Sequence, residues 1–215
     1  MKLVRPLINY HMRQRINRIQ FFLDNPLDTQ ELIFKDLVQT ASGTIWGSFF
    51  DFKEIQSFED YRNKVPLQDY ESLKPYIDRT IKGERDVLWP GKTKWFAKSS
   101  GTTSDRSKYI AITKEALQNC HYQSGQDVLT LYLENFPERG IFSGKGMVMG
   151  GSQSIHSLNE EAITGDLSAI LMQNMPIIGE IYRVPKLEVA LMDDWEEKLS
   201  MLIESTLSED LTNIS

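Results

Sequence analysis

The chain has 215 residues, of which 40% are hydrophobic and 25% are charged, and its formal net charge is −6 at pH 7. This composition is typical of a soluble globular protein and excludes a largely disordered one. The acidic balance argues against general nucleic-acid binding, because proteins that bind phosphate backbones usually carry a basic excess.

The single cysteine, Cys120, excludes an internal disulfide framework and is compatible with a reducing cytosol. The N-terminus lacks the apolar segment and small-residue cleavage site of a secretory signal. No stretch approaches the roughly 18 apolar residues of a membrane span. We therefore expect a cytoplasmic protein with no membrane partner, and the oligomeric state is left open.

Helical periodicity dominates the first part of the chain. Apolar residues recur every three to four positions from Ile8 to Leu23, and Asn25-Pro26 should end that helix. A second helix is predicted over residues 29–39. Its inward-facing side chains are expected to be Leu32, Ile33, Leu37 and Val38. Residues 40–47 are interpreted as a loop and residues 49–52 as a short extended piece.

Two further helices precede the first glycine-rich turn. Ser57 can cap a helix through Lys64, and a second one ends at Gly83 with Pro75 in its first turn or at a kink. None of these segments carries a recognisable catalytic pattern. We interpret residues 1–92 as a helical layer that supports a sheet.

Residues 93–215 alternate between strand and helix character. Thr113 can cap a helix to about residue 134, in which Cys120 is expected to be a buried thiol. A strand is predicted from Lys145 into Gly150-Gly151-Ser152, and a short helix over residues 165–174. Asp194 can cap a helix with an apolar stripe, and residues 208–215 are interpreted as a polar tail. The expected fold class is α/β, with a mixed sheet and flanking helices.

Two short strand-like runs, residues 95–97 and 109–112, flank a loop rich in hydroxyl side chains. Its candidate nucleotide-binding residues are Ser99, Ser100, Gly101, Thr102 and Thr103. Hydroxyls, turn N–H groups and one ammonium are the donors that a polyphosphate needs. Lys108 closes the loop and is the candidate catalytic residue, acting as a point charge on the phosphates. We call residues 99–108 the hydroxyl loop.

The hydroxyl loop differs from the two commonest nucleotide motifs. A Walker A motif would place a glycine before the lysine and Ser or Thr after it, whereas Ser107 and Tyr109 flank Lys108. The G-x-G-x-x-G spacing of a dinucleotide fold is also missing. The alternative is a solvated hairpin loop, since Ser, Thr, Gly and Asp are ordinary turn residues.

The turn Gly150-Gly151-Ser152 is the candidate substrate-binding segment. Ligands of α/β proteins collect where strands end, so this turn could form a second wall of the site. An ordinary strand-ending turn is the alternative. No carboxylate or cysteine stands at metal-ligand spacing from His11, His121 or His156, so we predict no structural zinc site and name no metal-ligating residue.

The run Trp95-Phe96-Ala97-Lys98-Ser99-Ser100-Gly101-Thr102-Thr103, with Lys108 downstream, closely resembles the first nucleotide motif of the Gretchen Hagen (auxin-responsive) acyl acid-amido synthetases, in their bacterial form. The resemblance covers nearly the whole chain. It extends to Tyr70-Glu71, Leu73-Lys74-Pro75-Tyr76-Ile77, Leu88-Trp89-Pro90-Gly91, Gly150-Gly151-Ser152, Gly165-Asp166-Leu167-Ser168 and Met192-Asp193-Asp194-Trp195.

This resemblance implies part of the large N-terminal domain of an acyl-adenylate-forming enzyme. Such enzymes convert ATP and a carboxylic acid to an acyl-adenylate and pyrophosphate, after which an amino acid attacks the activated carbonyl. ATP and Mg²⁺ are the implied cofactors, and a small carboxylic acid and an amino acid are the implied partners. The whole chain, residues 1–215, would be one incomplete adenylating domain, with residues 93–215 as its nucleotide-loop part.

Two features depart from the family pattern. The chain has Ser104-Asp105-Arg106-Ser107 where plant members carry a glycine-rich segment. It also stops at Ser215, whereas family enzymes are more than twice as long, and their later motifs have no counterpart here. We therefore expect this chain to be an N-terminal portion that is inactive by itself.

Two other functions fit the same residues. Related adenylating enzymes with a similar loop are acyl-CoA ligases, which use coenzyme A as the acceptor. A non-catalytic nucleotide-binding or assembly module could also retain the loop. These alternatives differ in the acceptor used and in whether any acyl transfer occurs.

Overall fold

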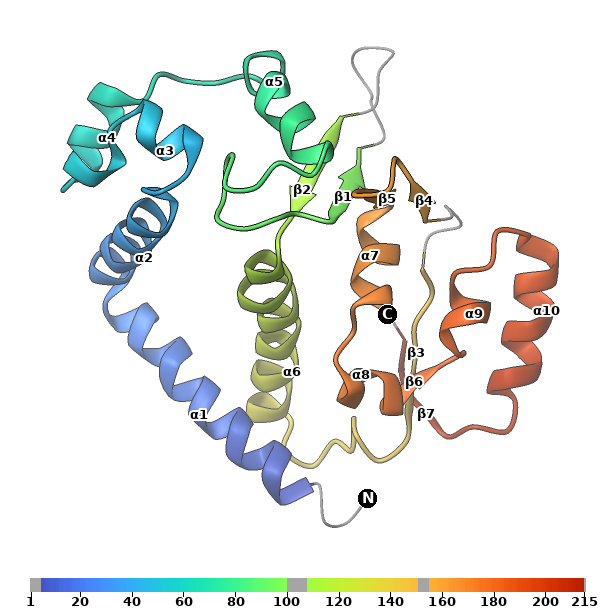
Figure 1. Ribbon diagram of the computed structural model, residues 1–215. Helices are drawn as coiled ribbons and strands as arrows, with labels where there is room; N and C mark the ends of the chain where they lie inside the picture. Colours follow the sequence, from blue (N-terminus) through green and yellow to red (C-terminus); the bar gives the residue numbers. More distant parts are fainter. Residues whose placement is uncertain (1–4, 100–107, 151–154, 215) are drawn as a thin grey trace. The chain divides into compact units, whose positions relative to one another are not determined.

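The computed structural model describes residues 5–99, 108–150 and 155–214 (Figure 1). The backbone divides into two compact units, each described by itself below. Unit 1 comprises Met1–Arg15, Leu117–His156 and Thr164–Ser215, and unit 2 comprises Ile16–Ala116 and Ser157–Ile163. The described elements form mixed α/β structure, as the sequence predicts.

Helices make up the first part of unit 2. They are α1 (Arg5–Asp24, whose first residues belong to unit 1), α2 (Pro26–Ala41), α3 (Ile45–Phe49), the 3₁₀ helix η1 (Phe52–Glu54), α4 (Phe58–Lys64) and α5 (Tyr70–Ile81). The predicted stop at Asn25-Pro26 is confirmed, and α2 begins at Pro26 itself, because the fixed φ of proline suits the first helical position. Ser57 caps α4 as predicted, in a reciprocal capping box with Asp60.

The hydrophobic core of unit 2 lies between these helices. Its buried residues are Val38, Ala41, Trp46, Phe52, Ile55 and Val65. The loop predicted over residues 40–47 and the extended piece over 49–52 are wrong, because Trp46 and Phe52 enter this core from α3 and η1. Of the four α2 side chains expected inward, only Val38 is buried. Helical spacing therefore located α2 but misjudged which side chains it buries.

The sheet of unit 2 carries the hydroxyl loop. Strands β1 (Trp95–Lys98) and β2 (Tyr109–Ile112) pair antiparallel, with Lys98 opposite Tyr109, which confirms the two predicted strands. Two short strands, β5 (Ile163–Gly165) and β4 (His156–Ser157), of which only Ser157 and Ile163 belong to unit 2, complete the order β2-β1-β5-β4, so β2 is an edge strand. The fully buried Phe96 anchors β1.

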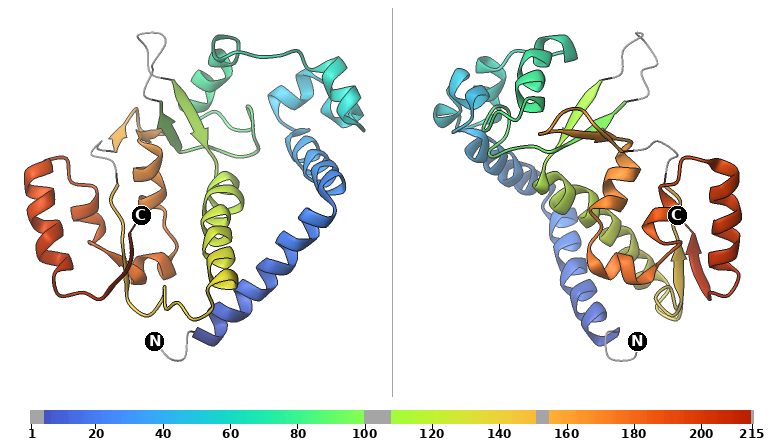
Figure 2. Two further views of the ribbon diagram at one scale, coloured as in Figure 1. Left: turned by 180° about the vertical axis from the view of Figure 1, so that it is seen from behind. Right: turned by 45° about the vertical axis from the view of Figure 1, so that its right-hand side comes forward.

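Unit 1 contains a second, parallel sheet. Its strand order is β6 (Arg183–Val184), β3 (Lys145–Met147) and β7 (Leu211–Ile214). Both pairs are parallel, so the strands end at the same edge of the sheet (Figure 2). The helical elements are the π-helix η2 (Ala116–Tyr122, whose first residue belongs to unit 2), α6 (Gln123–Asn135), α7 (Leu167–Gln173), α8 (Ile177–Tyr182), α9 (Leu187–Ala190) and α10 (Trp195–Thr206). The buried side chains of Ile170, Val184 and Leu202 lie in this unit.

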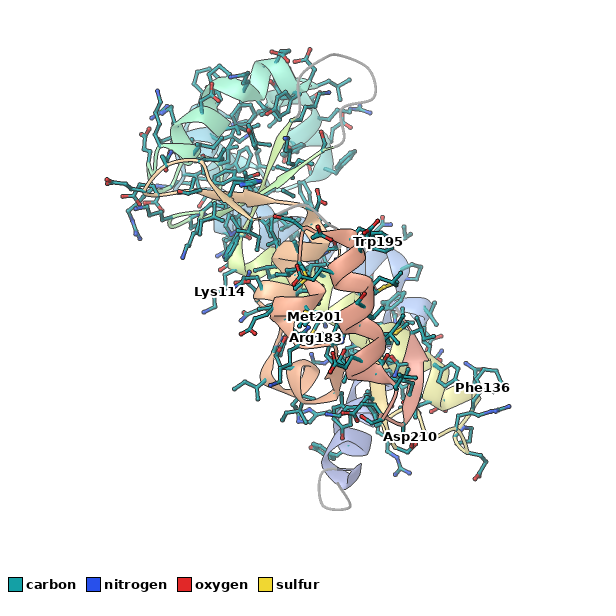
Figure 3. The ribbon with its side chains drawn as sticks, turned by 90° about the vertical axis from the view of Figure 1, so that its right-hand side faces the viewer. Lys114, Phe136, Arg183, Trp195, Met201 and Asp210 are labelled. Carbon is teal, nitrogen blue, oxygen red and sulfur yellow. The ribbon has the colours of Figure 1, made fainter. Side chains whose placement is uncertain are left out.

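Two expectations for unit 1 are wrong. Cys120 is exposed and not a buried thiol, because η2 widens the helix turn at that position. Residues 211–214 form β7 and not a polar tail, since their backbone pairs with β3. The prediction that Asp194 caps a helix is confirmed by α10. The apolar stripe of this helix buries Leu202 but leaves Trp195 55% exposed (Figure 3).

Candidate functional site

Ser99 and Lys108 face each other where the β1–β2 hairpin opens into the hydroxyl loop. The Ser99 amide donates to the Lys108 carbonyl at 2.9 Å, and the Lys108 amide donates to the Ser99 hydroxyl oxygen at 3.2 Å. The structure thus brings together the first and last residues of the hydroxyl loop. Both side chains are half-buried.

Tyr70, the first residue of α5, contacts this opening in two ways. Its hydroxyl oxygen accepts a hydrogen bond from the Tyr109 amide at 2.9 Å, and the Lys108 ammonium lies 5.4 Å from the centre of its ring. In the sequence, Tyr70 is the first of the apolar residues that recur every three to four positions up to Ile81, a pattern that predicts a helix and no functional role. Only its place in the resembling Tyr70-Glu71 pair gave a signal for a role near the loop.

The start of α5 is held by its own cap. The Asp69 carboxylate accepts from the Ser72 amide at 2.8 Å, and the Asp69 amide donates to the Ser72 hydroxyl at 3.0 Å. Hydrogen bonding from Ser72, chiefly from its backbone amide, lowers the pKa of the Asp69 carboxyl group below its ordinary value. Tyr70 therefore projects from a fixed helix start.

Lys108 is a cation without a carboxylate partner in the described ranges 5–99, 108–150 and 155–214. Lys74 of α5, by contrast, is paired with Asp78 at 2.6 Å. Among the described residues, no carboxylate therefore competes with an anion for the Lys108 ammonium.

The remaining predicted loop residues, Ser100, Gly101, Thr102 and Thr103, lie outside the described residues, and so do Gly151 and Ser152. Their roles in binding nucleotide and substrate stay predictions.

Gly150 belongs to unit 1, follows β3 in the chain and is buried. A Cβ atom at this position would lie 2.6 Å from the Met172 sulfur and 3.2 Å from Leu191 Cδ2, so only glycine fits without movement. Its carbonyl accepts a hydrogen bond from the Lys198 ammonium at 3.0 Å. The predicted turn thus begins at a packed and hydrogen-bonded residue, and its role as a second wall of the site stays a prediction.

Among the described residues, His, Cys, Asp and Glu form no group of three that could hold a metal ion. The helices in the same part of the chain also include none that is long and apolar enough to cross a bilayer.

Comparison with known proteins places these features in a family. The model of the GH3 family N-terminal domain matches residues 15–215. An indole-3-acetic acid-amido synthetase of Arabidopsis thaliana, GH3.17, is 27% identical over 124 residues, which are 56% of this chain and 20% of that protein. The 4-substituted benzoates-glutamate ligase GH3.12 of the same plant is 32% identical over 93 residues, or 42% of this chain and 15% of that protein.

Solved structures agree on the fold. The acyl acid amido synthetase AtGH3.15 in complex with 2,4-DB superposes with a TM-score of 0.74 at 15% identity, over 89% of this chain and 33% of that one. The chain thus spans about a fifth of the length of GH3.17 and a third of this solved structure. The predicted α/β fold with a mixed sheet and flanking helices is confirmed, whereas the bacterial type and the division at residue 92 stay predictions. The chain belongs to the GH3 family, of whose N-terminal domain it forms part.

Proposed function

We propose that this chain is the part of a ligase that binds the phosphates of ATP, and that this ligase conjugates a carboxylic acid to an amino acid. The observation that carries the proposal is the opening of the β1–β2 hairpin, where Ser99 and Lys108 lie opposite each other and the Lys108 ammonium has no carboxylate partner among the described residues. Family membership and the names of the relatives support the choice of reaction.

The proposed reaction has two steps. A substrate carboxylate attacks the α-phosphorus of ATP, which forms an acyl-adenylate and releases pyrophosphate. The amine of an amino acid then attacks the acyl carbon, an amide forms and AMP leaves. Both steps depend mainly on positioning and on charge neutralisation, so no protein nucleophile is needed.

In the first step, negative charge accumulates on the departing pyrophosphate. We propose that Lys108 stabilises this negative charge, because an ammonium is a strong donor to phosphate oxygens. The Ser99 hydroxyl and the remaining hydroxyl-loop residues would supply further donors. Mg²⁺, when bound with ATP, would neutralise phosphate charge. Proteins usually bind Mg²⁺ through substrate phosphates, water and one or two carboxylates, so a cluster of three protein ligands would not be required.

A titration of the protein with Mg-ATP, followed by calorimetry, tests the proposal. Replacing Lys108 with alanine should weaken ATP binding by about 10- to 100-fold, since a hydrogen bond to a charged group contributes about 1.5–3 kcal/mol. Lys114→Ala is the matched control, because it removes the same charge from an exposed lysine close by. Equal affinities of the wild type and both variants would overturn the assignment of Lys108.

A second experiment identifies the acceptor of the acyl group and tests whether the chain catalyses the reaction. Acyl-AMP, amide and thioester products can be distinguished by mass spectrometry after incubation with ATP, Mg²⁺, a panel of carboxylic acids and either an amino acid or coenzyme A. Thioester formation would favour the acyl-CoA ligase alternative. ATP binding without any product or ATP–pyrophosphate exchange would fit our expectation for this chain by itself, and would also fit a non-catalytic module. An amide product formed by this chain alone would contradict that expectation.

A further inference from the structure

Tyr109 is the first residue of the edge strand β2, and the hydrogen-bond pattern of the hairpin determines which way its backbone amide points. Ser99 and Lys108 stand opposite each other at a hydrogen-bonded position of the hairpin, since the Ser99 amide donates to the Lys108 carbonyl. Such positions alternate along an antiparallel pair, so the next pair, Lys98 and Tyr109, is not hydrogen-bonded across the strands. The Tyr109 amide therefore points away from β1, toward the open edge of the sheet.

At that open edge the Tyr70 hydroxyl accepts the hydrogen bond of the Tyr109 amide at 2.9 Å. An unpaired backbone amide at a sheet edge needs an acceptor, and here a side chain from α5 provides it. The contact ties the backbone next to Lys108 to the start of a capped helix. The position of the lysine backbone is thus set by two elements, β1 and α5.

The Tyr70 ring contacts the other end of the same lysine. The Lys108 ammonium lies 5.4 Å from the ring centre, within the range in which the electron-rich face of an aromatic ring attracts a cation. A lysine side chain has a flexible four-carbon stem, so this contact restricts the ammonium to fewer positions. Within the part of the chain that the structure describes, no carboxylate pairs with this ammonium, so its N–H groups that point away from the ring can donate to an anion.

We propose that Tyr70 is a positioning residue for Lys108 in nucleotide binding, an inference that rests on the proposed function. Its hydroxyl holds the backbone beside the lysine, and its ring orders the ammonium before the phosphates arrive. Restricting a flexible group in its binding position lowers the entropy lost on binding, so ATP should bind more tightly with the ring than without it.

Two substitutions separate the contacts of Tyr70. Tyr70→Phe keeps the ring and removes the acceptor of the Tyr109 amide, whereas Tyr70→Leu removes both. We expect Tyr70→Leu to weaken Mg-ATP binding by about 3- to 10-fold, as the usual strength of a cation–ring contact implies. Tyr70→Phe should retain most of the affinity. Circular dichroism and thermal unfolding of both variants establish whether they fold.

The double variant Tyr70→Leu/Lys108→Ala tests whether Tyr70 acts through the lysine. We expect it to bind Mg-ATP no more weakly than Lys108→Ala, because without the ammonium the ring has nothing to position. Additive losses would overturn the inference, and so would a Tyr70→Leu variant that folds and binds ATP with wild-type affinity.

A measurement without nucleotide keeps this inference apart from the proposed function. The rate at which an amine-reactive reagent labels Lys108, followed by peptide mass spectrometry, reports the freedom of its ammonium. We expect faster labelling of Lys108 in Tyr70→Leu than in Tyr70→Phe or the wild type, with unchanged labelling of Lys114. Unchanged Lys108 labelling would overturn the positioning role even if ATP binds, whereas faster labelling without ATP binding would count against the proposed function alone.

Discussion

The buried ammonium of Lys198, on α10, donates a hydrogen bond of 3.0 Å to the carbonyl oxygen of Gly150, which follows β3. The Lys198 side chain is only 2% exposed, and in the described ranges no carboxylate pairs with it. A buried charge is costly unless it is hydrogen-bonded. The contact therefore links α10 to the first residue of the predicted substrate-binding turn.

Lys198→Met should destabilise the protein, because it keeps most of the stem but leaves the buried Gly150 carbonyl without its donor. We expect a loss of about 1–3 kcal/mol in the free energy of unfolding, measured with urea. Lys198→Ala should cost more, since it also leaves a cavity. A methionine variant that is more stable than the wild type would mean that the desolvation of the ammonium outweighs its hydrogen bond.

Gly150→Ala and Gly125→Ala should change stability in opposite directions. An added Cβ at Gly150 meets the Met172 sulfur at 2.6 Å, so the overpacked site should lose about 1–3 kcal/mol. At Gly125, within α6, nothing lies within 4 Å, and alanine should gain about 0.5–1 kcal/mol through its higher helix propensity. Urea unfolding of the two variants measures both effects, and losses of equal size would contradict the packing argument.

The Tyr122 hydroxyl should make the protein sensitive to alkaline pH. Burial raises the pKa of Tyr122 from 10.0 to about 12, and its hydroxyl donates to the Leu171 carbonyl at 2.8 Å. Because the folded state holds the proton more tightly than the unfolded state, this contribution is complete below pH 10 and is lost as the pH rises toward 12.

Unfolding curves of the wild type and Tyr122→Phe at pH 8 and pH 11 measure this effect. Phenylalanine cannot ionise, so the wild type should lose more stability than the variant between the two pH values. Parallel losses in both proteins would show that other groups cause the alkaline sensitivity.

The exposed face of α10 should promote self-association. Three apolar side chains of α10 and its C-cap residue lie at helical spacing, with exposed fractions from 42% to 81%: Trp195, Leu199, Ile203 and Leu207. Exposed contiguous apolar surface favours contacts between molecules. We expect Ile203→Lys to reduce light scattering at high protein concentration and to change the free energy of unfolding by less than about 0.5 kcal/mol. Leu202→Lys is the contrasting variant, since Leu202 is buried in the same helix and its replacement should unfold the protein.

Interactions between residues close together in the sequence allowed much of the secondary structure to be predicted. Ser57 and Asp194 cap α4 and α10 as predicted, and the two strand-like runs pair as β1 and β2. These features depend on hydrogen bonds within a few residues or on side-chain shape, so a short stretch of sequence specifies them. The helix at Trp46 was missed because its five residues give too little periodicity.

The amino-acid sequence by itself determined the family, the hairpin strands and the first and last residues of the hydroxyl loop. Only the tertiary structure decided that Tyr70, 39 residues before Tyr109 in the chain, accepts its amide hydrogen bond and lies beneath the Lys108 ammonium. It also decided that Lys198 reaches Gly150 and that most of the α10 stripe stays exposed. The physical reason is that hydrophobic spacing shows which side chains share a helix face, whereas burial and long-range contacts depend on which other elements pack against that face.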